Sequence, residues 1–205
     1  MSNPYKLNLS KYSTHRVIIE NIGLNMNVLD VGCNDGYIGK MSNNTNKFYG
    51  LDYLKESVEE AKKIYSDVLE YDLNNLINLP WDIKFDVIVF ADVLEHLLYP
   101  ETVLNFFVAN YLKENGKIIV SLPNIANWEI RLNLLFGKFD YTDTGILDKT
   151  HLHFYTFESA KILISIPNLK LINDFGGASF FGPIIKILPF LKPLLATNII
   201  LIAKK

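Results

Sequence analysis

The most constraining feature of this sequence is a regular alternation of short apolar runs with segments of helical periodicity. Runs such as VLDVG at 28–32 are typical of strands that are buried on both faces. Strands that alternate with helices over this length predict a parallel sheet with right-handed crossovers. The apolar runs lie at 28–32, 48–52, 67–73, 85–92 and 116–123, and the helical segments lie at 11–22, 35–43, 54–65 and 100–112.

We therefore predict an α/β fold: a Rossmann-like, doubly wound, mostly parallel seven-stranded sheet with helices on both faces. The last two strands are expected at 169–175 and 198–205. We expect Ser10 to cap the first helix, since a serine oxygen can accept from the free N–H groups of a first turn. Prolines exclude one regular helix in the segment before the last strand. They are Pro183, Pro189 and Pro193.

Composition restricts the partners and the location. The net charge is -2 and the only arginines are Arg16 and Arg131, so the basic surface of a nucleic-acid-binding protein is missing and no nucleic acid is expected. A single cysteine, Cys33, cannot form an intrachain disulfide. No signal-peptide-like stretch and no run of about 18 uncharged apolar residues is present. A cytoplasmic location is the expectation.

A glycine-containing turn follows the first predicted strand. Gly32 allows the backbone to approach a ligand closely, and Gly36 allows close packing of a helix. The spacing differs from the dinucleotide pattern G-x-G-x-x-G, and no phosphate-binding lysine follows. Asp30, just before the turn, suits a cationic ligand better than a pyrophosphate. S-adenosylmethionine, which carries ammonium and sulfonium charges, is such a ligand.

Further acidic residues end the neighbouring strands. Asp52 follows Gly32 by twenty positions, the usual place of a ribose-binding carboxylate in nucleotide-binding α/β folds. Asp72 could accept from an adenine amino group while Leu73 supplies an apolar face. The fourth strand ends at Ala91 and is followed by DVLEH.

At these motifs the sequence resembles the class I S-adenosylmethionine-dependent methyltransferases. VLDVGCNDG resembles their first motif, GLD the second, YDL the third and FDVIVFADVLEHL the fourth, within 26–123. The resemblance implies that 26–123 is the cofactor-binding core, 124–157 an acceptor-side insertion and 158–205 the sheet-closing part of a single domain, 1–205. The cofactor-binding residues that it implies are Asp30, Gly32, Cys33, Gly36, Asp52, Asp72, Leu73, Ala91 and Asp92.

The resemblance also assigns parts of the cofactor. It places Gly32, Cys33 and Gly36 along the methionine part, Asp52 on the ribose hydroxyls and Asp30 toward the ammonium end. Asn34 stands where the family commonly has glycine. Because asparagine tolerates a left-handed backbone better than other non-glycine residues, we expect the loop to keep its shape.

The segment from Ser121 to Thr156 resembles a subgroup related to methionine-biosynthesis and ubiquinone-biosynthesis methyltransferases and found with polysaccharide glycosyltransferases. The resemblance implies a sugar or other hydroxyl acceptor. Some ubiquinone-type relatives bind a divalent metal through acids and a histidine of the fourth motif, where this chain has Asp92, Glu95 and His96. Asp92 replaces the glutamate of those relatives, so no metal is expected here.

Three histidines are candidates for the catalytic base. His96 follows the fourth strand, and an imidazole of near-neutral pKa there would suit proton removal from a hydroxyl; a packing role is the equal alternative. His151 and His153 alternate by two residues, so one face of a strand could present both. The alternative is that they hold the insertion in place by hydrogen bonds.

Two apolar segments remain. Trp128, Leu132 and Leu135 have helical spacing, and we interpret them as a buried stripe. The segment 180–195 is either a cover of the core or a patch that contacts a membrane surface, with its lysines at the interface.

The sequence thus predicts a methyltransferase that methylates the oxygen of a small-molecule, sugar or lipid-linked glycan hydroxyl by in-line transfer. One alternative is a non-catalytic protein that binds S-adenosylmethionine and partners a biosynthetic enzyme. Another is a nicotinamide oxidoreductase, against which the glycine spacing argues.

Overall fold

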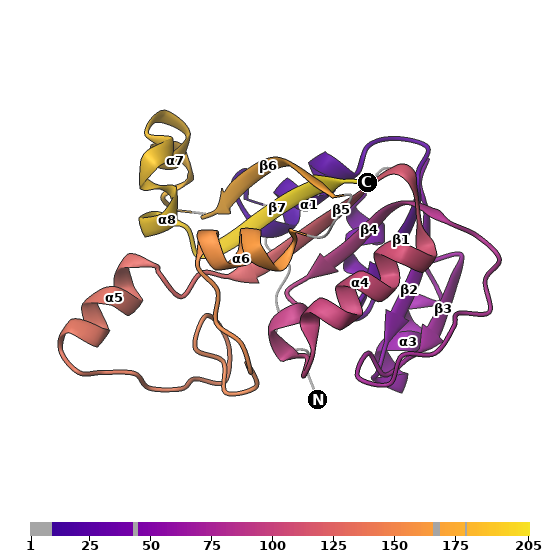
Figure 1. The fold of residues 1–205 in the computed structure, drawn as a ribbon, viewed down its shortest axis with the longest axis horizontal. Coiled ribbons are helices and arrows are strands. Elements are labelled where there is room, and N and C mark those ends of the chain that lie inside the picture. The colour runs from indigo at the N-terminus through magenta and orange to yellow at the C-terminus, as the bar shows by residue number, and fades with distance from the viewer. Residues whose placement is uncertain (1–9, 43–44, 166–168, 179) are drawn as a thin grey trace.

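The computed structural model describes residues 10–42, 45–165, 169–178 and 180–205. Within them lies one seven-stranded sheet of order β3-β2-β1-β4-β5-β7-β6 (Figure 1). The first five strands are parallel, and β7 runs antiparallel to both of its neighbours. The strands are β1 (Asn27–Val31), β2 (Lys47–Asp52), β3 (Asp67–Glu70), β4 (Phe85–Ala91), β5 (Leu112–Pro123), β6 (Lys170–Gly177) and β7 (Asn198–Lys204). The predicted fold class is confirmed.

Helices cover both faces of this sheet. They are α1 (Thr14–Ile22), α2 (Tyr37–Met41), α3 (Lys55–Ala61), α4 (Pro100–Tyr111), α5 (Trp128–Leu135), α6 (Phe157–Leu163), α7 (Gly182–Ile187) and α8 (Lys192–Leu195), with 3-10 turns η1 (Leu94–His96) and η2 (Pro189–Leu191). Alternate residues of the central strands enter two separate cores: Ile88 packs in the core under α4 and α6, and Val89 in the core under α1, α2 and α3. Burial on both faces explains the uniformly apolar strands.

The first helix begins later than predicted. Its N-cap is Ser13, whose side chain accepts from the Arg16 N–H at 3.4 Å, so the expected cap at Ser10 is wrong. The third helix ends at Ala61, short of the predicted residue 65. The chain then turns and places the Tyr65 hydroxyl against Asp30, 2.6 Å from Oδ2. The residue predicted to end this helix therefore lies outside it and contacts β1.

The insertion and the proline-containing segment extend from one end of the sheet (Figure 1). As predicted, Pro183, Pro189 and Pro193 divide 180–195 into short pieces, namely α7, η2 and α8. The expected buried stripe on α5 is wrong, because Trp128 is 40%, Leu132 45% and Leu135 78% exposed. Ile130 is the one buried residue of this helix, whose apolar residues lie on several sides, so spacing alone could not identify its buried side. Among the described residues, no helix is long and apolar enough to cross a membrane.

Candidate functional site

The loop between β1 and α2 has three left-handed residues. Gly32, Asn34 and Gly36 have φ angles of 75°, 50° and 77°, which confirms that asparagine can replace glycine in this loop. A Cβ on Gly32 would stand 2.5 Å from the Val93 side chain, and one on Gly36 would stand 3.1 Å from the Tyr65 ring. Both positions favour glycine by backbone conformation, and at Gly32 the close contact with Val93 excludes a Cβ as well.

Asp52 joins this loop to the next one. Its Oδ2 accepts from the Asn34 N–H at 2.8 Å, and its Oδ1 accepts from the Leu54 N–H at 2.9 Å. The carboxyl group is mostly buried, and each oxygen keeps one further lone pair for another donor. The carboxylate thus holds the loops after β1 and β2 in a fixed relation.

Asp30 is fully buried behind the glycine loop. One oxygen accepts from the Tyr65 hydroxyl, while Oδ1 has no hydrogen-bond partner among the described residues. Burial is the main cause that raises the pKa of Asp30 to about 7. Burial likewise raises the pKa of the neighbouring Cys33 thiol, which keeps it protonated and unreactive at neutral pH. An unpartnered buried oxygen of this kind suits a cationic group nearby.

The remaining predicted cofactor residues lie just beyond the carboxyl ends of β3 and β4. Asp72 is exposed just beyond β3, and its Oδ1 accepts from the Asn74 N–H at 2.9 Å, while Leu73 packs against the core. Asp92 follows Ala91 with a φ of 54°, a backbone conformation that non-glycine residues rarely adopt. Its Oδ1 accepts from the Ser121 hydroxyl and the Asn198 amide, at 2.9 and 3.0 Å.

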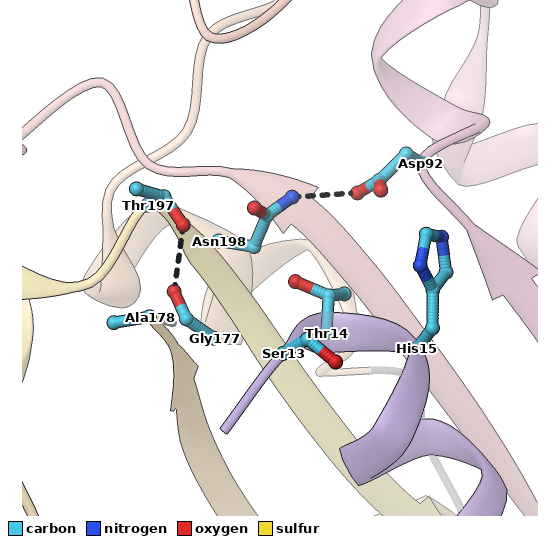
Figure 2. A pocket seen from close by; sticks show the side chains of 8 residues that line it. All are labelled: Ser13, Thr14, His15, Asp92, Gly177, Ala178, Thr197 and Asn198. Atoms are coloured by element: carbon cyan, nitrogen blue, oxygen red, sulfur yellow. Dashed lines mark hydrogen bonds between the residues drawn. The ribbon is translucent and has the colours of Figure 1, made fainter. Parts of the chain in front are cut away.

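A cavity of about 170 Å³ opens beside Asp92 (Figure 2). Its lining comes from the start of α1 and from residues around the ends of β4, β6 and β7. The lining residues are Ser13, Thr14, His15, Asp92, Gly177, Ala178, Thr197 and Asn198. Sequence reasoning found only Asp92 of this set, because the lining comes from segments separated by more than a hundred residues.

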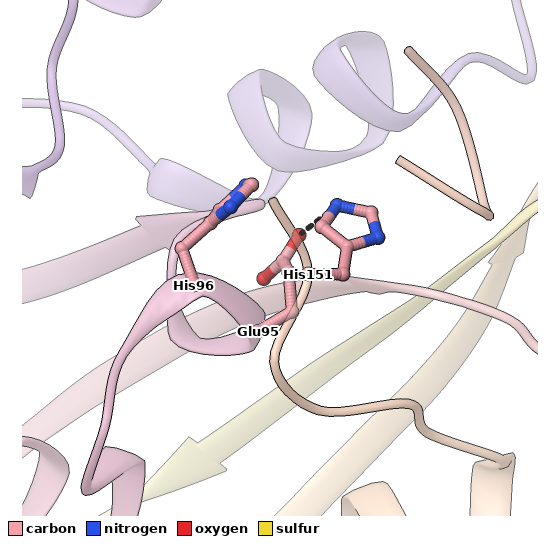
Figure 3. A group of neighbouring side chains, drawn as sticks. All are labelled: Glu95, His96 and His151. Carbon is pink, nitrogen blue, oxygen red and sulfur yellow. Dashed lines mark ion pairs between the residues drawn. The ribbon is translucent and has the colours of Figure 1, made fainter. Parts of the chain in front are cut away.

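Glu95, His96 and His151 meet at the end of β4 (Figure 3). The two imidazole centroids are 4.7 Å apart, and His151 Nε2 lies 4.0 Å from Glu95 Oε1. The Glu95 carboxyl group is fully buried, and neither oxygen has a hydrogen-bond partner among the described residues. The three side chains each offer a ligand atom, and these atoms lie within 4.8 Å of one another, close enough to hold a metal ion.

Backbone N–H groups of the insertion form hydrogen bonds to this cluster. The N–H groups of Leu152 and His153 both donate to the Glu95 carbonyl, at 2.8 and 3.1 Å. No strand forms over 151–154, so the prediction that one strand face presents His151 and His153 is wrong. His153 instead lies beside Tyr155, with ring centroids 6.3 Å apart. Sequence reasoning named Glu95 only as a fourth-motif residue, because a lone glutamate gives no sign of complete burial.

Comparison with solved structures places the fold in a known class. The N-methyltransferase NodS of Bradyrhizobium japonicum, in complex with S-adenosyl-L-homocysteine, matches with a TM-score of 0.66 at 14% identity, over 100% of this chain and 93% of that chain. A SAM-dependent methyltransferase from Aquifex aeolicus matches with a TM-score of 0.61 at 18% identity, over 95% of this chain and 90% of that one. The protein has the fold of class I S-adenosylmethionine-dependent methyltransferases.

The sequence identifies the family. Residues 13–176 match the family of methionine biosynthesis protein MetW, and the chain belongs to this family. The mitochondrial ubiquinone biosynthesis O-methyltransferase of Candida albicans is 32% identical over 88 residues, which is 38% of this chain and 27% of that protein's length. The resemblance inferred from the motifs is confirmed.

The buried carboxyl group of Asp30 predicts a pH dependence of stability. Its pKa rises from 3.8 to about 7 on folding, so between these values the folded state binds more protons than the unfolded state. This contribution to stability is fully present below pH 3.8 and is lost as pH rises through 7. Relative to Asp30→Asn, the wild type should lose on the order of 2–4 kcal/mol across this window. Urea unfolding of both proteins at pH 5, 7 and 8 measures the difference; parallel profiles would contradict it.

Proposed function

We propose that this protein is an S-adenosylmethionine-dependent methyltransferase that methylates a hydroxyl oxygen of a small molecule, a sugar or a lipid-linked glycan. The observation that carries the proposal is the left-handed loop of Gly32, Asn34 and Gly36, which the Asp52 carboxylate holds through the Asn34 N–H. Beside it lies the Asp30 oxygen that has no hydrogen-bond partner within the described part of the chain. Membership of the MetW family and the fold shared with NodS, itself in complex with S-adenosyl-L-homocysteine, support the same cofactor.

Each part of the cofactor has candidate residues at this edge. Gly32, Cys33 and Gly36 would line the methionine part, with Asp30 facing the ammonium group. Asp52 keeps lone pairs for the ribose hydroxyls. The strand ends on either side complete the proposed cofactor-binding set with Asp72, Leu73, Ala91 and Asp92.

The acceptor would enter the cavity beside Asp92. The cavity presents the hydroxyl-bearing side chains of Ser13, Thr14 and Thr197 together with the imidazole of His15. Such donors and acceptors suit a polar, hydroxyl-bearing substrate. Transfer by direct in-line attack requires mainly that the reacting atoms are held about 3–3.5 Å apart.

Histidines at the end of β4 would promote loss of the acceptor's proton. Burial lowers the pKa of His96, with a smaller effect from His151, so its imidazole is neutral at pH 7 and can accept a proton. His151 and His153 are the other candidates. His96 and His151 lie side by side, with ring centroids 4.7 Å apart.

Cofactor binding gives the first prediction of this proposal. Asp52→Ala removes the acceptor of the Asn34 and Leu54 N–H groups as well as the proposed ribose ligand. The variant should bind S-adenosylmethionine and S-adenosylhomocysteine at least tenfold more weakly by calorimetry, while Asp82→Ala, an exposed acid, should bind as the wild type does. Binding of NADH and of neither sulfonium-derived ligand would refute the proposal.

The catalytic role of His96 is tested by separating turnover from binding. His96→Ala should lower kcat by about 10²–10⁴-fold, the usual contribution of general-base catalysis, while the Kd for S-adenosylmethionine stays within about threefold. The assay uses an acceptor found by screening sugars and lipid-linked glycans, and Leu98→Ala serves as an exposed control. Equal turnover in the variant and the wild type would exclude the role. Cofactor binding without transfer to any screened acceptor would favour the alternative, a non-catalytic partner of a biosynthetic enzyme.

The exposed apolar side chains of 180–195 support a lipid-linked acceptor. Phe180, Ile187 and Phe190 are 84%, 77% and 75% exposed. The only charged residues of this segment are Lys186 and Lys192. Lys192 is ion-paired with Asp174 of β6, which leaves Lys186 as the other cation of the segment. An exposed apolar surface beside a lysine suits peripheral contact with an anionic membrane.

Vesicle binding tests this contact. The double variant Ile187→Ser/Phe190→Ser should lose most co-sedimentation with phosphatidylglycerol-containing vesicles. Ile162→Ser, which changes an equally exposed isoleucine (74%) on α6, should retain it. Wild-type protein that stays in the supernatant would contradict the membrane contact and leave the cofactor proposal untouched.

A further inference from the structure

We propose that a cavity between α5 and the chain that follows it binds a neutral, polyhydroxylated ligand, the carbohydrate part of a methyl acceptor. The cavity has a volume of about 380 Å³, which lies within the range of about 300–1,000 Å³ that is usual for small-molecule sites. The cavity beside Asp92, of about 170 Å³, is smaller than that range. A glycan that places one hydroxyl group beside Asp92 would therefore need a second site for the rest of the molecule.

Backbone hydrogen bonds fix the walls of this cavity. The Lys138 N–H donates to the Asn133 carbonyl at 2.9 Å, which turns the chain back at the end of α5. The Thr142 N–H donates to the Leu147 carbonyl at 2.9 Å, and the Lys149 N–H donates to the Thr142 carbonyl at 3.0 Å. These bonds close 142–149 into a loop. Because main-chain bonds hold the walls in place, a ligand can bind with little ordering of the chain.

Polar and aromatic residues alternate along the wall that follows α5. Lys138, Asp140 and Thr142 line the cavity. The rings of Phe139 and Tyr141, which do not line it, pack edge to face against each other with centroids 5.7 Å apart. Such alternation is that of an extended chain, whose neighbouring side chains point to opposite sides. The aromatic rings therefore anchor this wall, while its polar side chains face the cavity.

The lining combines an apolar floor with polar side chains that have no protein partner. Ile130 and Leu147 form the floor, and each is 7% exposed. Four polar lining side chains form no hydrogen bond or ion pair with any described residue: Glu129, Asn133, Lys138 and Asp140. Charged groups of the same loop that do not line the cavity do pair, since Lys149 Nζ lies 2.6 Å from Asp143 Oδ1. The four polar side chains are thus available to a ligand.

The types of these polar groups select a neutral ligand that is rich in hydroxyls. The carboxylates of Glu129 and Asp140 accept hydrogen bonds, the Lys138 ammonium donates them, and the Asn133 amide does both. A hydroxyl group can donate and accept at once, so several hydroxyls on one ligand would satisfy the whole set. A phosphate would meet two carboxylates against one ammonium, and a cationic ligand would meet the ammonium. The apolar floor suits the C–H face of a sugar ring.

The cavity is connected to the histidines at the end of β4. Ile146 lines it, and the Ile146 carbonyl lies 3.1 Å from His151 Nδ1. The His151 ring lies beside His96, with centroids 4.7 Å apart, and beside Phe154 at 6.3 Å. Phe154 in turn packs against Phe139 of the cavity wall, at 5.8 Å. As the sugar site of a methyl acceptor, the cavity rests on the proposed function, whereas sugar binding itself rests on the lining alone.

Saturation-transfer NMR of the full-length protein tests the site. The probes are the neutral sugars cellobiose, maltose and N-acetylglucosamine, the anionic glucose 1-phosphate and the cationic glucosamine. At least one neutral sugar should bind, and more tightly than both charged sugars. Asp140→Ala and Asn133→Ala should each weaken binding of that sugar by about three- to tenfold, the effect of losing one hydrogen bond. Asp143→Ala, which removes an acid of the same loop that does not line the cavity, should bind it as the wild type does.

Three results would overturn the sugar site: no binding of any neutral sugar, tighter binding of a charged sugar than of every neutral one, or unchanged binding in both Asp140→Ala and Asn133→Ala. Thermal unfolding establishes that each variant folds, and calorimetry with S-adenosylhomocysteine measures cofactor binding separately. Cofactor binding without sugar binding would overturn the sugar site alone. Sugar binding that Asp140→Ala weakens, in a protein that does not bind the cofactor, would overturn the proposed function and leave the sugar site intact.

Discussion

The position of β1 between β2 and β4 is the constraint on which the rest of the structure depends. In the strand order, β2 pairs with one edge of β1 and β4 pairs with its other edge. Connections that leave in opposite directions open a crevice at the carboxyl ends of these strands. Asp52 ends β2 at this edge, and the glycine loop, Asp92 and Glu95 follow strands that end there.

The acidic groups at this edge differ in how far the protein itself satisfies them. Asp52 accepts from two backbone N–H groups, and Asp92 accepts from two side chains. Asp30 has a partner for one oxygen, and Glu95 has none for either among the described residues. Buried polar groups are normally hydrogen-bonded. The hydrogen bonds of Asp52 and Asp92 therefore fix the loops, whereas the carboxyl groups of Asp30 and Glu95 have oxygens that a ligand would satisfy.

Backbone hydrogen bonds hold the insertion next to Glu95, at the end of β4. Backbone N–H groups of Leu152 and His153 share the Glu95 carbonyl, and the side chain of His151 turns toward the Glu95 carboxyl group. The same segment carries α5, whose apolar residues are largely exposed at the end of the molecule where α7 also lies (Figure 1). One segment therefore connects the residues at the end of β4 to an exposed apolar surface.

The sequence alone determined the strands, most of the helices and the glycine loop, because each depends on patterns within a few residues: apolar runs, helical spacing, and left-handed positions at Gly32, Asn34 and Gly36. Only the tertiary structure decided that His151 meets Glu95, that Ser13 caps α1, that α5 exposes its apolar residues, and which residues line the cavity beside Asp92. These features depend on which distant segments pack together, and burial of a polar or apolar side chain is a property of that packing.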